Sequence, residues 1–251
     1  MTATAVHPDT DWILRPKPNP GAAVRLFCFP WAGGGASVYR RWAEALPGTI
    51  EVCAVQLPGR ESRFREIAYQ TMEGLIPDLC DGIWPYLTRP YAFFGHSMGA
   101  TVAFELARQI RRKGLPGPRR LLVSGARAPQ LPEGRPPLHL LPQPQFWQAV
   151  CRLNGMAPEV TANDELCQLL TPMLRADFSV CETYRFHPEA PLDSPITALG
   201  GDQDRLVTVD RLVQWGEQTT GEFRLHLFSG DHFFVNTAWQ EVLRVVAREL
   251  G

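Results

Sequence analysis

Residues 91–114 read YAFFGHSMGATVAFELARQIRRKG, and the order of residue types predicts a strand, a sharp turn and a helix. The opening aromatic run is typical of a strand that is buried on both faces. Val102, Leu106 and Ile110 recur every four residues and so share one face of a helix. Basic residues followed by Gly114 are typical of a helix C-terminus.

Strand-like and helix-like segments alternate along most of the chain. Apolar runs predict strands at 24–29, 50–57, 91–95, 120–126, 195–201 and 223–229, and periodic stripes predict helices at 38–46, 72–83, 99–113 and 239–250. Such alternation is typical of a mostly parallel sheet with helices on both faces, an α/β fold. Pro77 lies inside one stripe, so we expect that helix to be kinked or divided.

Two regions depart from the alternation. Residues 1–23 are polar and proline-rich, and we expect a loosely held arm. Residues 127–190 begin with a proline-rich stretch and continue as helix-like pieces without a strand. We interpret 127–190 as a helical insertion over the carboxyl edge of the sheet, within a single domain that spans 1–251.

The turn Gly95-His96-Ser97-Met98-Gly99 matches the nucleophile-elbow pattern GxSxG. In this pattern a strained turn between a strand and a helix exposes the serine oxygen, and the flanking glycines allow both elements to approach. The pattern is short and therefore weak by itself, but its position between a predicted strand and a predicted helix favours Ser97 as a nucleophile.

A serine nucleophile needs a base and a group that orients the base. With this elbow, the acid and then the base follow the serine along the chain. His232 lies directly after the strand predicted at 223–229, so we predict that it is the base. Asp204 and Asp202 both follow the strand predicted at 195–201, and the Gly201…Asp204…Val207 spacing favours Asp204.

The reaction also needs an oxyanion hole, which consists of two backbone N–H groups that face the developing charge. The first is expected from Met98, the residue after the nucleophile. The second is expected in the loop after the strand at 24–29, from Ala32 or, as the alternative, from Trp31. The glycines at 33–35 could also serve a tight turn alone.

Composition excludes several other classes of function. The chain has 25 basic and 26 acidic residues, a net charge of -1, which disfavours a nucleic-acid or anionic-membrane partner. Its six cysteines show no metal-ligand spacing, so we expect neither a metal nor a cofactor. The N-terminus lacks the pattern of a signal peptide, and no apolar run could span a bilayer, which together predict a cytoplasmic protein.

Six segments in this order resemble the type II thioesterases, which accompany nonribosomal peptide and polyketide synthases. They are Phe29-Pro30-Trp31-Ala32-Gly33-Gly34, Gln56-Leu57-Pro58-Gly59-Arg60-Glu61, Gly95-His96-Ser97-Met98-Gly99, Leu174-Arg175-Ala176-Asp177, Gly201-Asp202-Gln203-Asp204 and Gly230-Asp231-His232-Phe233-Phe234. The group is similar to the medium-chain thioesterase of animal fatty acid synthesis, and the resemblance covers roughly residues 22 to 250.

The resemblance implies an α/β-hydrolase whose Ser97, Asp204 and His232 form a triad and whose insertion is a mobile lid. It implies hydrolysis of acyl groups from the phosphopantetheine arm of acyl or peptidyl carrier domains, which clears misloaded or stalled units, and we expect a monomer. The family usually has histidine where this chain has Trp31, a difference that affects the expected pocket entrance.

Carrier domains of this kind are generally acidic, so a local basic face is expected near the carboxyl edge of the sheet. Arg60, Arg63 and Arg65 follow a predicted strand on that edge, and we favour them over the cluster at 108–113. Two alternatives remain open at this point. One is a stand-alone carboxylesterase or lipase that acts on small esters, and the other is a non-catalytic relative that serves as a binding module.

Overall fold

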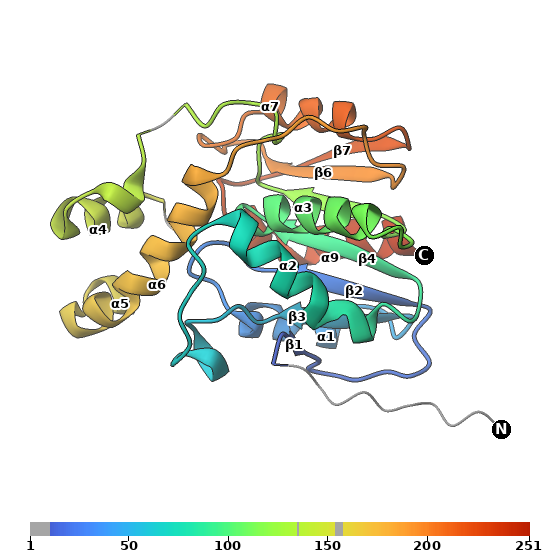
Figure 1. The fold of residues 1–251 in the computed structure, drawn as a ribbon, viewed down its shortest axis with the longest axis horizontal. Coiled ribbons are helices and arrows are strands. Elements are labelled where there is room, and N and C mark those ends of the chain that lie inside the picture. Colours follow the sequence, from blue (N-terminus) through green and yellow to red (C-terminus); the bar gives the residue numbers. More distant parts are fainter. Residues whose placement is uncertain (1–10, 135, 154–157) are drawn as a thin grey trace.

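The computed structural model describes residues 11–134, 136–153 and 158–251. Its centre is one sheet in the order β1-β3-β2-β4-β5-β6-β7, shown in Figure 1. The strands are β1 (Ile13–Leu14), β2 (Val24–Phe29), β3 (Ile50–Val55), β4 (Tyr91–His96), β5 (Leu121–Ser124), β6 (Ile196–Gly201) and β7 (Phe223–Phe228). Strands β2 to β7 pair in parallel, and β1 pairs antiparallel with β3. The predicted fold class, a mostly parallel sheet flanked by helices, is confirmed.

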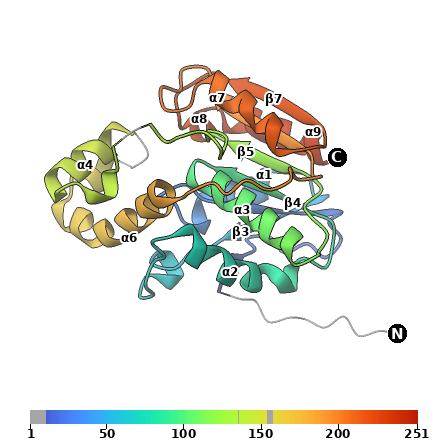
Figure 2. The ribbon, with the colours of Figure 1, turned by 45° about the horizontal axis from the view of Figure 1, so that its top comes forward.

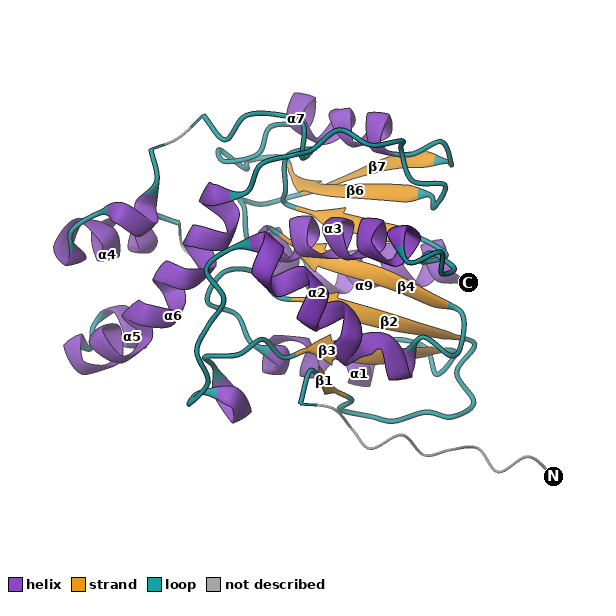
Figure 3. Cartoon of the chain, viewed as in Figure 1, coloured by secondary structure: helices purple, strands orange, loops and turns teal. Residues whose placement is uncertain are grey.

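Helices cover both faces of the sheet. Helices α2 (Met72–Ile83) and α3 (Met98–Arg112) pack on one face, and α1 (Arg40–Ala45) and α9 (Trp239–Leu250) pack on the other. Figure 3 shows α2 and α3 in front of the strands. The alternation within β2 explains the two cores, since Phe27 and Phe29 face the first pair of helices while Leu26 and Cys28 face the second.

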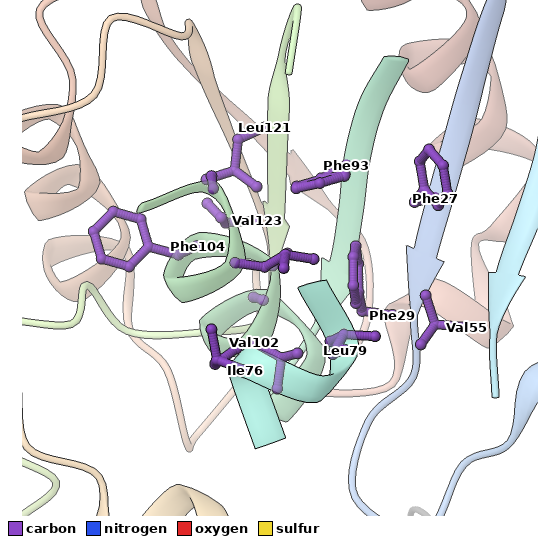
Figure 4. Close-up of a cluster of buried hydrophobic side chains, with 14 of the residues drawn as sticks. Phe27, Phe29, Val55, Ile76, Leu79, Phe93, Val102, Phe104, Leu121 and Val123 are labelled. Carbon is purple, nitrogen blue, oxygen red and sulfur yellow. The ribbon is translucent and has the colours of Figure 1, made fainter. Parts of the chain in front are cut away.

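The core under α2 and α3 is rich in aromatic side chains (Figure 4). Phe93 of β4 meets Phe27 and Phe29 of β2 edge to face, with ring centroids 5.8 and 5.1 Å apart. Helix α2 is continuous across Pro77, so it is not divided there, and the alternative of a kink at Pro77 stays a prediction. Its buried stripe, which includes Leu75 and Leu79, packs on this core, and Thr71 caps its first turn.

The described part of the N-terminal arm is not loosely held, contrary to our prediction. Ile13 is buried within β1, and Trp12 lies against Tyr69 with ring centroids 6.2 Å apart. A two-residue strand gives no periodic signal in a polar, proline-rich stretch, so burial at Ile13 depends on the sheet edge that it covers. Residues 1–10 of the predicted arm lie outside the described residues.

The segment between β5 and β6 contains the helices α4 (Gln143–Arg152), α5 (Pro158–Thr161) and α6 (Asp164–Thr183), with loops on either side of them. Figures 1 and 2 show these three helices together beyond one end of the sheet. Helices α4 and α6 share a small core of their own that includes Phe146, Trp147 and Leu174. That this insertion acts as a lid remains a prediction.

Short elements fill the remaining connections. They are the 3₁₀ turns η1 (Ala36–Tyr39), η2 (Glu61–Arg63), η3 (Trp84–Tyr86), η4 (Leu138–Leu140) and η5 (Gln214–Gln218), and the helices α7 (Val209–Val213) and α8 (Phe234–Thr237). The strand order matters more for function. The chain passes from β2 to β3 on one side and then returns to β4 on the other, so the strand order reverses between β2 and β4. In parallel sheets, the carboxyl ends of strands beside such a reversal are the usual place for a ligand.

Candidate active site

Ser97 lies at this reversal, on a strained turn between β4 and α3. Its φ of 53° is in the left-handed region, which residues other than glycine rarely adopt. A Cβ on Gly95 would lie 2.1 Å from the carbonyl oxygen of Gly99, and a Cβ on Gly99 would lie 2.1 Å from that of Phe29. The two glycines therefore allow strand, turn and helix to approach closely, as the elbow pattern predicts.

The loops after β6 and β7 bring an acid and a base to Ser97. His232 Nε2 lies 3.1 Å from Ser97 Oγ, and His232 Nδ1 lies 2.8 Å from Asp204 Oδ2. Both His232 and Asp204 are 8% exposed, so their contact is largely shielded from water. The three residues predicted as nucleophile, acid and base thus form one continuous hydrogen-bonded series, although their catalytic roles remain predictions.

The two candidate acids have different partners. Asp204 uses its second oxygen, Oδ1, to accept hydrogen bonds from the backbone N–H groups of Leu206 and Val207, at 2.7 and 3.1 Å. Asp202 is exposed and accepts a bond from Gly230 N, 3.0 Å away. Asp204 is therefore the carboxylate that contacts His232, and its backbone bonds fix the orientation of its side chain.

The loop after β2 lies beside the elbow and offers N–H groups. In the described part of the chain, the amides of Ala32, Trp31 and Met98 donate to no protein acceptor. The amide of Gly33 is engaged, because it donates to Asp177 Oδ2 at 2.7 Å. Met98 begins helix α3, where the unpaired N–H groups and the helix dipole favour negative charge. The choice between Ala32 and Trp31 stays a prediction.

His96 is a buried neighbour of His232, and the sequence predicted no role for it. Its ring lies 5.1 Å from that of His232, and its Nδ1 lies 2.9 Å from Ser124 Oγ. Burial lowers the pKa of His96 well below the usual histidine value, and the nearby His232 lowers it further. The rings of Trp31 and Phe233 each lie 5.7 Å from the ring of His96, so aromatic side chains surround His96 on two sides. His96 directly precedes Ser97 in the sequence, and this adjacency is the signal that could have placed it at the site.

A pocket of about 340 Å³ opens between Ser97 and the insertion. Ser97, His232 and Trp31 line its inner side, and Leu174 and Phe178 of α6 line the outer side. Charged groups also border the pocket, including Arg127, which is paired with Glu133, and Glu182 of α6. The pocket can therefore hold an apolar chain, with polar groups placed at a few positions.

The basic residues proposed for docking occupy different environments. Arg60 is 4% exposed and forms an ion pair with Asp177, so the prediction that it lies on a docking surface is wrong. Arg63 is also engaged, since its guanidinium lies over the ring of Trp12, 4.3 Å from the centroid. Arg65 is exposed. Burial of an arginine depends on a partner that neutralises its charge. The partner of Arg60 is Asp177, which lies 117 positions away in the sequence, so the residues around Arg60 do not indicate its burial.

Two further findings concern the described residues. They contain no group of three or more histidine, cysteine or carboxylate side chains placed to hold a metal ion. Among the helices of the same residues, none combines the length and the apolar character that crossing a bilayer requires.

The fold and the geometry at Ser97 define an α/β-hydrolase. Residues 24–250 match the family model described as a thioesterase domain. The chain belongs to the thioesterase family and is a hydrolase that acts on thioesters.

Three relatives illustrate this similarity. Gramicidin S biosynthesis protein GrsT of Aneurinibacillus migulanus is 44% identical over 95% of this chain and 93% of its own. The structure of the type II thioesterase BorB from the borrelidin biosynthetic cluster has 36% identity and a TM-score of 0.89, and the match covers 98% of this chain and 100% of that chain. Linear gramicidin dehydrogenase LgrE of Brevibacillus parabrevis is 43% identical over 100% of this chain and 96% of its own.

The dehydrogenase name does not suit the glycine run of this chain. Dinucleotide-binding loops follow G-x-G-x-x-G or G-x-G-x-x-A, whereas here Gly33 and Gly35 are followed by Val38. The resemblance to type II thioesterases is confirmed by the family match and by the similarity to BorB, which is called a type II thioesterase.

Proposed function

We propose that this protein hydrolyses acyl thioesters on the phosphopantetheine arm of carrier domains through an acyl-enzyme at Ser97. The observation that carries the proposal is the series Ser97 Oγ–His232 Nε2–His232 Nδ1–Asp204 Oδ2, with contacts of 3.1 and 2.8 Å, beside a pocket of about 340 Å³. Because the substrate itself carries the phosphopantetheine, we expect the protein to need no cofactor.

In the first half of the reaction, His232 Nε2 accepts the proton of Ser97 Oγ while that oxygen attacks the thioester carbonyl. The buried carboxylate of Asp204 holds the imidazole in the required tautomer and stabilises its positive charge. The carbonyl oxygen becomes negative and is stabilised by the N–H groups of Met98 and Ala32. The tetrahedral species then expels the pantetheine sulfur, which takes the proton from His232.

In the second half, water replaces the sulfur. His232 Nε2 accepts a proton from a water molecule that attacks the Ser97 ester, and the same oxyanion hole stabilises the second tetrahedral species. Collapse releases a carboxylic acid and returns the proton to Ser97 Oγ. Thus the same residues carry out both steps.

Support for a carrier-bound substrate comes from the relatives. GrsT carries the name of a gramicidin S biosynthesis protein, and BorB is called a type II thioesterase of the borrelidin cluster. We propose that this chain likewise serves a nonribosomal peptide or polyketide synthase and removes misloaded or stalled acyl groups. We also propose that the protein is monomeric and cytoplasmic.

One acyl group presented in three forms tests the proposal. The group is supplied on a phosphopantetheinylated carrier protein, as an N-acetylcysteamine thioester and as a p-nitrophenyl ester. We expect kcat/KM on the carrier to exceed that on the small thioester by at least about tenfold, which corresponds to about 1.4 kcal/mol. Comparable or lower values on the carrier would instead favour the stand-alone esterase.

A further inference from the structure

A buried ion pair joins the insertion to the body of the protein close to Ser97. Arg60 follows β3, and Asp177 lies in α6. Arg60 Nη1 lies 2.7 Å from Asp177 Oδ2, and Arg60 Nη2 lies 2.7 Å from Asp177 Oδ1. The two side chains are 5% and 3% exposed. A bidentate pair of this kind fixes both groups in direction as well as in distance.

Both side chains of the ion pair also form hydrogen bonds with the glycine loop after β2. Asp177 Oδ2 accepts the N–H of Gly33 at 2.7 Å, and Arg60 Nη1 donates to the carbonyl of Gly34 at 3.0 Å. Gln56 completes the support, because its Oε1 accepts the N–H of Ala36 at 3.0 Å while its Nε2 donates to the carbonyl of Arg60 at 3.1 Å. The loop is thus held by side chains of two segments that are distant in the sequence.

This support adds to the loop's own hydrogen bond, in which the N–H of Gly34 donates to the carbonyl oxygen of Trp31 at 2.9 Å. Three successive glycines, 33 to 35, leave the backbone with wide conformational freedom, and Gly33 has a φ of 84°. The peptide groups that the ion pair holds come directly after Ala32, whose N–H is the expected second donor to the oxyanion. An oxyanion donor must be aimed before the charge develops, and a displacement of about 1 Å can cost about a hundredfold in rate.

We propose that Arg60 and Asp177 are positioning residues, which hold the loop at 31–34 so that the N–H of Ala32 points at the oxyanion. The proposal rests on the function proposed for Ser97. It gives a role to the Gln56–Glu61 and Leu174–Asp177 segments, which the triad leaves unexplained. Asp177 accepts the N–H of Gly33, and the next residue of α6, Phe178, lines the pocket. The same contact therefore joins the oxyanion loop to the pocket wall formed by α6.

The test uses Asp177→Asn and Arg60→Lys, with Glu51→Gln as the matched control. Glu51 forms a similarly buried ion pair with Arg25, with 2.8 Å between them. This pair lies at the amino ends of β2 and β3, whereas Ser97 follows the carboxyl end of β4. Turnover of a p-nitrophenyl ester gives kcat and KM, and complete labelling by a fluorophosphonate counts the active sites. Neither readout needs a carrier protein, so failure on acyl-carrier substrates would leave this test intact.

For both variants we expect kcat per active site to fall about 10- to 100-fold, with KM within about twofold of the wild type. The Ki of a trifluoromethyl ketone, whose adduct with Ser97 is an oxyanion, should rise by the same factor. The Ki of the matching methyl ketone, which is only weakly electrophilic, should stay unchanged. Glu51→Gln should alter stability alone.

Wild-type kcat per active site in Asp177→Asn and Arg60→Lys would overturn the proposal. So would equal increases in the Ki of both ketones, because these would indicate a general change in the pocket. If neither single variant folds, the double variant Arg60→Met with Asp177→Leu decides, because it removes both buried charges together. The same loss of kcat is expected from it, and wild-type kcat would again contradict the proposal.

Discussion

Replacement of Asp204 by asparagine should abolish most of the activity without changing the shape of the site. Oδ1 of Asp204 accepts two backbone N–H groups, from Leu206 and Val207, so an asparagine must keep its carbonyl oxygen at that position. Its NH₂ group then faces His232 Nδ1, which lies 2.8 Å from Asp204 Oδ2 in the wild type. A donor at this place forces Nδ1 to act as an acceptor.

The consequence is the wrong tautomer of the base. The imidazole proton moves to Nε2, the nitrogen that lies 3.1 Å from Ser97 Oγ and must accept the serine proton. In serine proteases the same exchange lowers kcat about 10⁴-fold. At 1.36 kcal/mol for each factor of ten, we expect an increase of about 5 kcal/mol in the activation free energy.

The assay is kcat/KM on a small ester and on the corresponding acyl-carrier thioester. Asp202→Asn is the matched control, because it makes the same chemical change two residues away, on an exposed side chain that bonds to Gly230 N. We expect the control to stay within about threefold of the wild type. An Asp204→Asn enzyme with more than about a tenth of wild-type kcat, or a crippled Asp202→Asn enzyme, would refute the reasoning.

Three further predictions concern stability and cofactors. Because burial lowers the pKa of His96, this side chain stays neutral in the folded protein but binds a proton below about pH 6.5 in the unfolded chain. The free energy of unfolding should therefore fall below that pH, by up to about 1.4 kcal/mol per pH unit. His96→Gln should reduce this slope, measured by urea titrations at pH 5 to 7. Gly95→Ala places a Cβ 2.1 Å from a backbone oxygen and should lower the free energy of unfolding by more than about 4 kcal/mol, measured by urea unfolding. Gly114→Ala, at a φ of 68° with open space around it, should lower it by only about 1 to 2 kcal/mol in the same assay. Dialysis against EDTA should leave kcat unchanged, and restoration of a lost rate by added zinc would contradict the serine mechanism.

Patterns of apolar residues are sufficient to predict the parallel strands of the sheet. The parallel strands are short and mostly apolar, and such segments carry their signal locally. The short strand at Ile13–Leu14 was missed because its formation depends on pairing with β3 and not on its own residues. The residues of the candidate site could be proposed because the elbow fixes the order of acid and base along the chain.

Contacts between distant charges could not be predicted in the same way. The segment around Arg60 predicts a surface residue, because nothing within it shows that Asp177 neutralises Arg60 in the interior. The choice between Asp202 and Asp204 had a similar limit. The two aspartates differ by two positions in the sequence, and the path of the loop after β6 decides which one contacts His232.

The most direct test of the proposed function is intact-protein mass spectrometry after an acyl-carrier protein is mixed with this protein. The wild type should return the carrier to its free-thiol mass, and an acyl adduct should appear transiently on Ser97. Ser97→Ala should leave the carrier acylated and carry no adduct. A carrier that stays acylated in the presence of wild-type protein that hydrolyses simple esters, or a carrier that Ser97→Ala deacylates, would contradict the account.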